Sequence, residues 1–469
     1  MPHIQKLSDV VDWRLCIGCG ACAFICPNQK VKLIDFFAEG IRPVVVDTDC
    51  GLCRECLDVC PAAQSDFRSP SLRSSSASIN SFAKEWGPVI AIWEGHAADP
   101  EIRFKGSSGG VLTAIGTYCI EVLGMYGVLH IGKDPVDPIR NRTRLSRTRA
   151  QILSAAGSRY SPASVCNGLS LVEASPASCV VIGKPSEIAA VRNACKLRHE
   201  LGRKVGLTLS FFCAGSPSTE GTVALLQKMG VEPRSVGELR YRGNGWPGHF
   251  APVRRDEFEP YQKMTYRESW AFLQAYRPWS VQLWPDGTGE LADISCGDPW
   301  YDEPDGKNHG FSLVVARTER GREIIEGAMA SGYLKLRPAE NWKLAKSQFG
   351  LLAKKKAILG RRLALRIMGL PITRLDGLSL WHCWRQLSFT DKFRSVMGTL
   401  RRILMRKLFR PLKLDPLNSV SVKPLMIMMK SDESEPTLAI NKLLECRDDS
   451  MCDDWCETRP DDVRKGNHC

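Results

Sequence analysis

A short cysteine motif occurs twice near the N-terminus, and it constrains the fold more than any other feature of the chain. Residues 16–27 read CIGCGACAFICP, and residues 50–61, 34 positions later, read CGLCRECLDVCP. Both copies have the spacing C-x2-C-x2-C-x3-C-P, which lets thiolates surround an iron–sulfur cube while the backbone turns tightly between them. Zinc sites are the alternative, but they usually lack the third cysteine and the trailing proline. Two copies in register therefore predict two 4Fe–4S clusters in a ferredoxin-like α+β module at residues 1–65.

The division of the eight cysteines between the clusters follows from the ligand requirement. Each cube needs four thiolates, and in two-cluster ferredoxins the fourth cysteine of each run ligates the other cluster. The expected ligand sets are Cys16, Cys19, Cys22 and Cys60 for one cluster, and Cys50, Cys53, Cys56 and Cys26 for the other. Gly18 and Gly20 are expected to let the backbone fold closely against the sulfur atoms. Residues 31–35 and 41–47 are predicted to pair as strands.

Composition changes divide the rest of the chain into four segments. Residues 66–85 are rich in serine and are predicted to be a linker. From residue 86 to 340, strand-like apolar runs such as 179–183 and 204–213 are followed by helical patterns, which predicts an α/β domain. Residues 341–425 have mostly helical patterns. The acidic tail, residues 426–469, lacks an apolar period and is expected to be disordered.

The net charge of +13 resides in one of these segments. Residues 341–413 contain 18 Lys and Arg but only two acidic residues, Asp376 and Asp391, so the remainder of the chain is close to neutral. Basic residues interleaved with Leu, Ile and Met can form amphipathic helices that contact an anionic membrane surface, or helices that pack on the rest of the protein. Both interpretations stay open. Because no recognisable base-reading element accompanies the charge, nucleic acid is not expected as a partner.

The chain is expected in the cytoplasm, with a membrane-peripheral position as the alternative. No stretch approaches the roughly 18 apolar residues of a spanning helix. Residues 1–15 lack the apolar core of a secretory signal and include Asp9 and Asp12. The chain has 19 cysteines, many of them closely spaced in the sequence. In a reducing compartment such spacing indicates metal sites rather than disulfides.

Three glycine-rich segments in the α/β region have features of ligand-binding turns. KGSSGG at 105–110 precedes a helical run that begins at Val111, where an anion can bind beside Lys105. GSRYSP at 157–162 places a cation beside an aromatic ring. GKPSE at 183–187 follows a strand, where ligands commonly bind in open α/β sheets. Taken singly, each segment is more often an ordinary turn.

Taken together and in order, these segments resemble the coenzyme F-420 hydrogenase/dehydrogenase beta-subunit family. The resemblance also rests on Phe212-Cys213-Ala214-Gly215, on YRGNGWPG at 241–248 and on ELADISCGDPW at 290–300, and it covers about residues 10–340. That family includes 7-hydroxymethyl chlorophyll a reductase and bacterial members, some of them tied to surface-polysaccharide assembly. The resemblance implies FAD bound on the α/β domain and hydride transfer between the flavin and an organic substrate.

The resemblance also implies where the flavin binds. Its phosphates would lie near the residues of KGSSGG, and further cations would hold a remaining phosphate or an anionic substrate. The residues expected to bind the cofactor are Lys105, Ser107, Ser108, Gly109, Gly110, Arg159, Gly183, Lys184 and Arg242. The alternative for each cation is a solvated surface position. No catalytic residue is identified.

Two departures from the family pattern bear on the substrate. Many members have a cysteine where Ser186 stands here, and many have C-x2-C where this chain has Val281-Gln282-Leu283-Trp284. An additional cluster in the flavin domain, which some relatives have, is therefore not expected. Cys213 and Cys296 lack partners nearby in the sequence and are predicted to be buried structural cysteines.

The sequence favours one function and leaves two alternatives open. The leading hypothesis is an FAD- and iron–sulfur-dependent oxidoreductase. In it, ferredoxin or another low-potential donor reduces the clusters, and a flavin converts single electrons into hydride for an unidentified small organic substrate. One alternative is a non-catalytic electron-relay subunit of a larger redox complex. The other is a redox accessory protein of polysaccharide biosynthesis.

Overall fold

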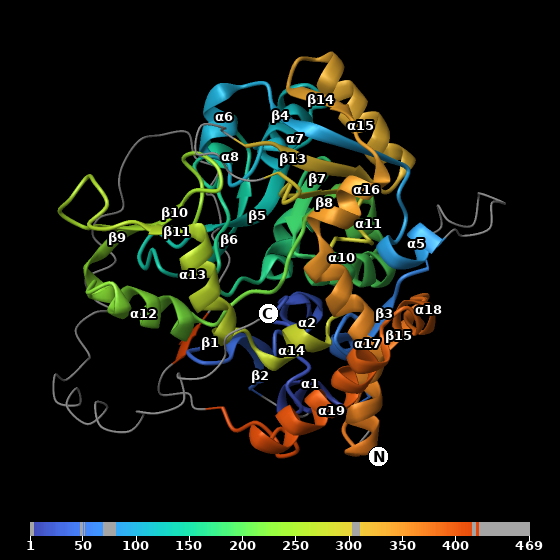
Figure 1. The fold of residues 1–469 in the computed structure, drawn as a ribbon. Helices are drawn as coiled ribbons and strands as arrows, with labels where there is room; N and C mark the ends of the chain where they lie inside the picture. Colours follow the sequence, from blue (N-terminus) through green and yellow to red (C-terminus); the bar gives the residue numbers. More distant parts are fainter. Residues whose placement is uncertain are drawn as a thin grey trace. The chain divides into compact units, whose positions relative to one another are not determined.

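The computed structural model describes residues 4–46, 50, 52–68, 81–302, 310–414 and 419–421. All of them belong to a compact unit that spans residues 1–427 (Figure 1). Most of the predicted linker and all of the predicted tail lie outside the described residues.

The N-terminal cysteine module consists of short helices around a β-hairpin. Its elements are α1 (Leu7–Asp12), α2 (Ala21–Ile25), β1 (Val31–Phe36), β2 (Gly40–Val45), α3 (Glu55–Asp58) and β3 (Gln64–Asp66). Strands β1 and β2 pair antiparallel, with Phe36 opposite Gly40, which confirms the predicted strand pair. Gly18 and Gly20 have φ angles of 73° and 88°. These angles are in the left-handed region that glycine adopts without strain, as the sequence predicted.

A mixed sheet of eight strands forms the centre of the described chain, in the order β14-β4-β13-β12-β8-β7-β5-β6. Its strands are β4 (Ala91–Ala97), β5 (Gly127–Lys133), β6 (Asn141–Ser146), β7 (Cys179–Gly183), β8 (Val205–Phe211), β12 (Ile294–Gly297), β13 (Ser312–Ala316) and β14 (Leu334–Pro338). The four inner strands β12, β8, β7 and β5 run parallel, and the outer strands pair antiparallel. The carboxyl ends of the parallel strands therefore lie at one edge, where ligands bind in open α/β sheets.

Helices cover both faces of this sheet. One face packs on α6 (Pro100–Lys105), α7 (Val111–Glu121), α8 (Arg149–Leu153) and α15 (Glu319–Ala330). The other face packs on η1 (Val165–Gly168), α9 (Leu169–Glu173), α10 (Pro185–Leu197) and α11 (His199–Lys204). Helix α2 of the cysteine module joins this second face, because Ala21 and Ile25 are buried in the same apolar cluster as Val181. The module is thus packed directly on the α/β body.

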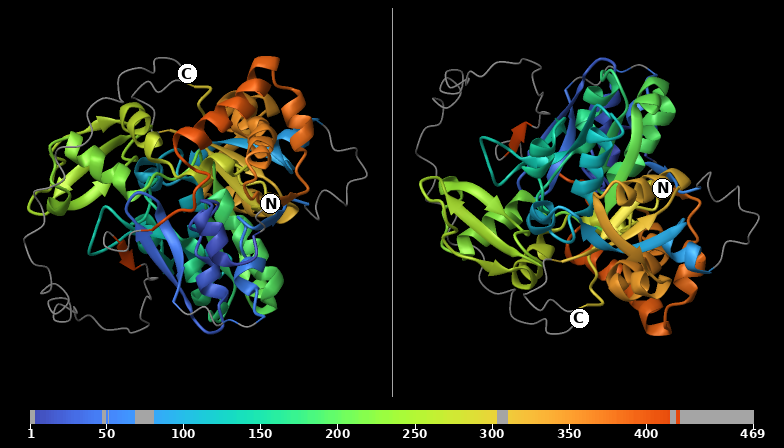
Figure 2. Two further views of the ribbon diagram at one scale, coloured as in Figure 1. Left: turned by 90° about the horizontal axis from the view of Figure 1, so that it is seen from below. Right: turned by 90° about the horizontal axis from the view of Figure 1, so that it is seen from above.

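A smaller sheet stands beside the large one in the views of Figures 1 and 2. It contains β9 (Val236–Arg240), β10 (His249–Arg254) and β11 (Met264–Thr265), and its core is shared with α12 (Thr219–Lys228) and α13 (Tyr266–Leu273). Short 3-10 turns η2 (Pro233–Ser235) and η3 (Gln274–Tyr276) lie in the same part of the chain.

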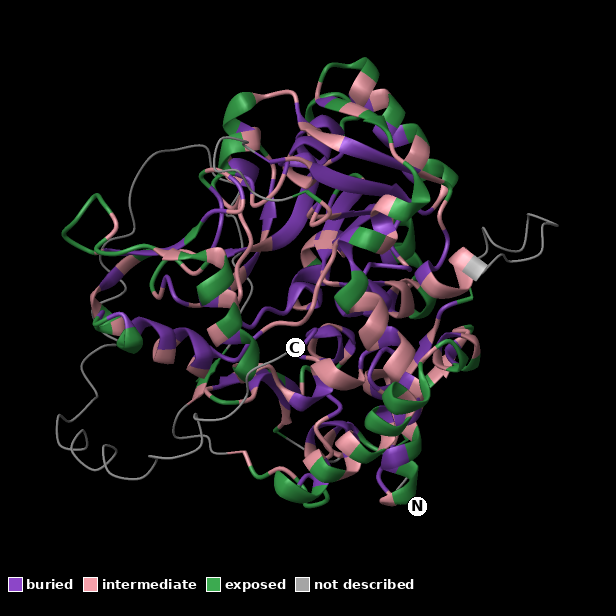
Figure 3. Ribbon diagram, in the orientation of Figure 1, coloured by how far each residue is buried: buried purple, intermediate pink, exposed green. Residues whose placement is uncertain are grey.

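The basic C-terminal segment forms helices that pack on the cysteine module and the body. Its helices are α16 (Asn341–Ser347), α17 (Phe349–Ile367), α18 (Leu380–Arg385) and α19 (Phe389–Met405), next to α5 (Ser81–Trp86) and α14 (Trp279–Leu283). Strand β15 (Arg374–Asp376) pairs with β3, and β16 (Ser419–Ser421) pairs with β1. Figure 3 shows the large sheet as buried, whereas α17 and α19 also carry exposed faces. None of the helices in the described ranges is long and apolar enough to cross a membrane.

Candidate functional site

The cysteines of the repeated motif gather into two groups. Burial and the neighbouring thiols of Cys19, Cys16 and Cys60 raise the pKa of Cys22 well above its usual range, with a smaller contribution from Cys56. Burial and the thiols of Cys53, Cys26 and Cys50 raise the pKa of Cys56. Cys60 is thus among the neighbours of the first copy, and Cys26 is among those of the second. The division of the cysteines between two clusters stays a prediction.

The chemistry of these groups fits an iron–sulfur cluster. The buried thiols of Cys16, Cys19, Cys22 and Cys60 cannot all ionise unless positive charge compensates them, and a bound iron–sulfur cluster would supply that charge. Adding a Cβ at Gly18 would bring it within 2.8 Å of the Ile41 carbonyl oxygen, so the loop between Cys16 and Cys19 folds against the hairpin. Within the described residues, no three His, Cys, Asp or Glu side chains lie close enough to share a single metal ion.

The two thiol groups differ in their access to solvent. Cys16, Cys19, Cys22 and Cys60 are buried, and we call this set the inner thiol group. In the outer thiol group, Cys50 and Cys53 are exposed, and Cys26 and Cys56 are partly buried. The inner group contacts the body directly, because the Cys166 amide of η1 donates a hydrogen bond to the Cys19 carbonyl oxygen at 3.0 Å. The outer thiol group is therefore the one nearer to solvent.

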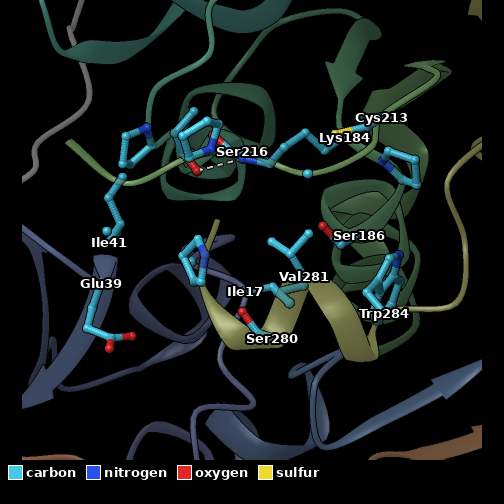
Figure 4. Close-up of a pocket in the computed structure, with 18 of the residues that line it drawn as sticks. Ile17, Glu39, Ile41, Lys184, Ser186, Cys213, Ser216, Ser280, Val281 and Trp284 are labelled. Carbon is cyan, nitrogen blue, oxygen red and sulfur yellow. Dashed lines mark hydrogen bonds between the residues drawn. The ribbon is translucent and has the colours of Figure 1, made fainter. Parts of the chain in front are cut away.

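A cavity lies between the loop that joins Cys16 and Cys19 and the carboxyl edge of the large sheet; Figure 4 labels Ile17 of that loop. It encloses about 600 Å³ of empty space, part of which is open to solvent. Ile17 and Gly18 of the inner loop form part of its wall, together with residues that follow β7 and β8. The polar and charged residues of the wall are Glu39, Arg42, Lys184, Ser186, Cys213, Ser216, Ser280, Asp286 and Lys354. A ligand in this cavity would thus lie beside the inner cluster site.

The positions at which this chain departs from the family pattern meet in the same cavity. Ser186, Val281 and Trp284 all form part of its wall, and so does Cys213 (Figure 4). Cys213, predicted to be a buried structural cysteine, is partly buried and forms part of the cavity wall. The same prediction is confirmed for Cys296, which is buried in the core of the body.

Of the residues predicted to bind the flavin, Lys184 lies at this cavity. It follows Gly183, the last residue of β7, and begins the turn into α10. Its ammonium donates to the Ala163 carbonyl oxygen at 3.0 Å and pairs with Glu187 at 3.0 Å. These partners hold Lys184 in place and balance its charge.

The remaining predicted flavin residues lie in a second place, around the loop that precedes α7. Gly110 caps this helix, and the Ser108 hydroxyl donates to the Phe311 carbonyl oxygen at 2.7 Å. The Gly109 amide donates to the Ser312 hydroxyl at 3.0 Å. Lys105 is half-exposed and pairs with Glu101 at 3.0 Å. The backbone of this loop is therefore held mainly by the segment that leads into β13.

Arg242, in the segment 241–248, joins this loop to the segment 290–300 of the family resemblance. Its guanidinium forms two hydrogen bonds to the Asp298 carboxylate, at 2.6 and 2.9 Å, and donates to the Ser107 carbonyl oxygen at 2.5 Å. It also lies over the Tyr266 ring, 4.4 Å from the centroid. Although burial opposes the charge, the Asp298 carboxylate raises the pKa of Arg242 well above its usual range. Arg242 is thus a buried structural cation in this structure.

Arg159 has a similar position. It donates to the Asn141 side chain and to the carbonyl oxygens of Leu239, Pro138 and Arg140. Burial lowers the pKa of this guanidinium. Protein acceptors therefore occupy most of its donors, and no solvated surface position is found for either arginine. Flavin binding by these residues stays a prediction.

One cavity residue had no sequence signal that pointed to it. Lys354 lies in α17, far along the chain from the glycine-rich segments, and the triplet Lys354–Lys356 indicated only a basic helix. Contacts of this kind depend on how a distant helix packs, and local patterns do not report them.

Known protein families match three parts of the chain. The N-terminal model of "Coenzyme F420 hydrogenase/dehydrogenase, beta subunit" matches residues 92–170, and the C-terminal model matches residues 177–341. A 4Fe-4S dicluster domain matches residues 15–63. Together the two beta-subunit models cover more than half of the chain.

Individual relatives are distant. The chain is 25% identical to the coenzyme F420-dependent sulfite reductase of Methanocaldococcus jannaschii, over 68% of this chain and 47% of that protein, so the match spans about half of that relative. It is 26% identical to the coenzyme F420 hydrogenase subunit beta of Methanosarcina barkeri, over 58% of this chain and 89% of that subunit. A chain in the structure of the F420-reducing [NiFe] hydrogenase complex from Methanosarcina barkeri is similar at a TM-score of 0.47 and 22% identity, covering 61% of this chain and 94% of that one. The two matched models place the chain in the coenzyme F420 hydrogenase/dehydrogenase beta-subunit family, and its N-terminal part is a 4Fe-4S dicluster domain.

Proposed function

We propose that this chain is an electron-transfer oxidoreductase in which two 4Fe–4S clusters act in series between a protein partner and a ligand in the cavity. The observation that carries the proposal is the order of the sites. The outer thiol group is exposed, the inner one is buried, and the loop of the inner group forms part of the cavity wall. The ligand sets are those of the two thiol groups.

The finer part of the proposal is FAD as the group that exchanges electrons with the inner cluster. A bound flavin would supply the conversion between single-electron transfer and hydride transfer. Lys184 and the turn after β7 would hold part of it at the cavity, and the loop of Ser107 to Gly110 is proposed for its phosphates. Support comes from the family resemblance and from the position of Lys184; the residues of the chain bind and orient the cofactor.

A low-potential electron donor such as a ferredoxin is proposed to dock at the outer thiol group. Two relatives are named as beta subunits of a hydrogenase and of a formate dehydrogenase. A subunit of this kind exchanges electrons with other proteins, and exposed Cys50 and Cys53 would bring the outer cluster close to such a partner. The organic substrate is proposed to be a small molecule that enters the cavity from its open side.

The basic helices are proposed to contact an anionic membrane surface. Helix α19 exposes one apolar stripe, formed by Phe389, Phe393, Met397 and Leu404. The adjoining face, with Ser395, Thr399 and Ile403, is buried against the protein. An exposed apolar stripe with arginines beside it is typical of helices that lie in a lipid interface. The packed face agrees with the alternative of a helical subdomain, so one helix can serve both purposes.

The experiment that tests the proposed function is a cofactor analysis. The protein is purified anaerobically, and iron, acid-labile sulfide and released flavin are measured on the same sample. About eight irons, eight sulfides and one FAD per chain are expected. About eight irons without flavin, even after incubation with FAD, would leave the electron-relay subunit as the function. An iron content near four would contradict the two-cluster arrangement.

A further inference from the structure

Lys354 is a charged residue of the cavity that lies outside the family match. The matched region ends at residue 341, whereas Lys354 comes from the first turns of α17. It forms part of the cavity wall together with Cys213 and Lys184. The basic C-terminal segment therefore adds a cation to a cavity that is otherwise built by the module and the body.

Among the described residues, Lys354 differs from its neighbours in having no hydrogen-bond or ion-pair partner. Lys355 pairs with Glu290 at 2.6 Å, and Lys356 pairs with Glu85 at 3.2 Å. The other cations of the cavity also have partners: Arg42 has Glu39 at 3.5 Å, and Lys184 has Glu187. The charge of Lys354 is thus the one that the described part of the cavity leaves unmatched.

Asp286 is the carboxylate that interacts electrostatically with Lys354, but it forms no ion pair with it. Asp286 accepts hydrogen bonds from the backbone amides of Thr288, Gly289 and Glu290, all at 2.8–2.9 Å. Burial, together with the nearby guanidiniums of Arg361 and Arg277, lowers the pKa of Lys354 to about 8, although Cys213 and Asp286 oppose this shift. An anion that binds beside an ammonium in such a site stabilises its charge, which lowers the free energy of the complex.

The Trp284 indole N–H is not available to a ligand in the same way. Trp284 is 7% exposed, and its indole nitrogen has almost no accessible surface and no hydrogen-bond partner. An anion in the cavity can therefore meet the Lys354 ammonium but not this N–H.

We propose that the cavity binds an anionic ligand, carrying a phosphate or a carboxylate group, through the Lys354 ammonium. Helix α17 then sets the charge preference of the cavity. The inference builds on the proposed function in treating the cavity as the ligand site. Anion binding itself requires neither electron transfer nor flavin.

Cys213 provides a reporter inside the cavity. Iodoacetate and iodoacetamide both alkylate a thiolate, with a carbon–sulfur bond formed and iodide released, but only iodoacetate is an anion. Both alkylation rates at one cysteine are proportional to the same thiolate fraction, so this fraction drops out of their ratio. The iodoacetate-to-iodoacetamide ratio therefore reports the local positive potential. Cys195 of α10 is the internal reference, because it is half-buried and does not belong to the cavity. Labelling is measured by mass spectrometry on the anaerobically purified holoprotein.

The variants separate Lys354 from the general charge of the helix. In the unchanged protein, the iodoacetate-to-iodoacetamide ratio should be higher at Cys213 than at Cys195. Lys354→Met should lower the ratio at Cys213 at least about threefold, and Lys354→Arg should keep it. Lys356→Met, on the same helix and outside the cavity, should leave it unchanged. An unchanged ratio in Lys354→Met, or no labelling of Cys213 by either reagent, would overturn the inference.

Protection by small anions identifies the ligand group. Inorganic phosphate and malonate are each added before labelling with iodoacetamide. Protection by phosphate alone assigns a phosphate group, and protection by malonate alone assigns a carboxylate; protection by both supports a general anion site. In Lys354→Met, neither anion should slow the labelling of Cys213. If neither anion slows it in the unchanged protein, the inference is overturned. Iron and flavin measured on the same samples show separately whether the proposed function fails.

Discussion

Replacing Asp298 by asparagine should destabilise the body strongly, because it leaves the Arg242 charge without its counter-ion. The Arg242 side chain is 2% exposed, and that of Asp298 is 18% exposed. Breaking a buried ion pair by removing one partner costs about 3–5 kcal/mol. Asp298→Asn keeps the size of the side chain and one hydrogen-bond acceptor, and Asp298 is partly hydrated. We therefore expect a loss near the lower limit, about 3 kcal/mol in the free energy of unfolding.

The assay is urea denaturation followed by far-UV circular dichroism, on anaerobically purified protein. With a slope of about 3 kcal/mol per molar urea, a loss of this size lowers the midpoint by about 1 M. The matched control is Glu257→Gln, which removes the carboxylate of the pair that Arg254 forms on the surface at 3.2 Å. That change should cost less than about 1 kcal/mol. If Asp298→Asn shifted the midpoint no more than the control does, the structural role given to Arg242 would be wrong.

Three further predictions follow from single residues. Gly18→Ala should lower the iron content from about eight toward four per chain, because its Cβ would strike the Ile41 carbonyl oxygen. Gly124→Ala is the control, since Gly124 is also at positive φ but has nothing within 4 Å of an added Cβ, and it should retain all the iron. Equal iron loss in both variants would refute the argument. Sulfate should protect Cys213 from alkylation about tenfold less at pH 9 than at pH 7, because Lys354 loses its proton near its lowered pKa of about 8 while the charge of sulfate stays constant. Protection that persists at pH 9 would exclude this lysine as the binding cation. The full chain should sediment with vesicles containing anionic lipid in a salt-sensitive manner, and Phe393→Ser should reduce the bound fraction; absence of binding at low salt would eliminate the membrane contact.

Local patterns predicted the cysteine module well, because its information lies in short spacings. The match of a 4Fe-4S dicluster domain to residues 15–63 confirms the iron–sulfur module that the two runs predicted, and the division of their cysteines between two clusters stays a prediction. The strand 179–183, followed by a helix, was predicted from its apolar run and corresponds to β7 and α10. These features depend on residues close together in the sequence.

The composition of the cavity could not be predicted in the same way. Arginine is a residue type that often binds phosphate, so the sequence alone made Arg242 and Arg159 candidates. The structure shows that Asp298 accepts hydrogen bonds from Arg242 and that backbone carbonyl oxygens accept them from Arg159. Lys354 was indistinguishable from Lys355 in the sequence, yet one is paired with a carboxylate and the other lies at the cavity. Such differences arise from long-range packing, which a local charge pattern does not encode.

The central claim is that two clusters lie in series between solvent and the cavity, and low-temperature EPR tests it most directly. The dithionite-reduced protein and its Cys53→Ala variant are compared after anaerobic purification. The unchanged protein should show about two unpaired spins per chain, with a spectrum broadened by the interaction of neighbouring clusters. The variant should show about one spin with a simple, unbroadened spectrum, since the buried inner cluster remains. One spin in the unchanged protein, or loss of both signals in the variant without loss of folding, would contradict two independently ligated clusters in series.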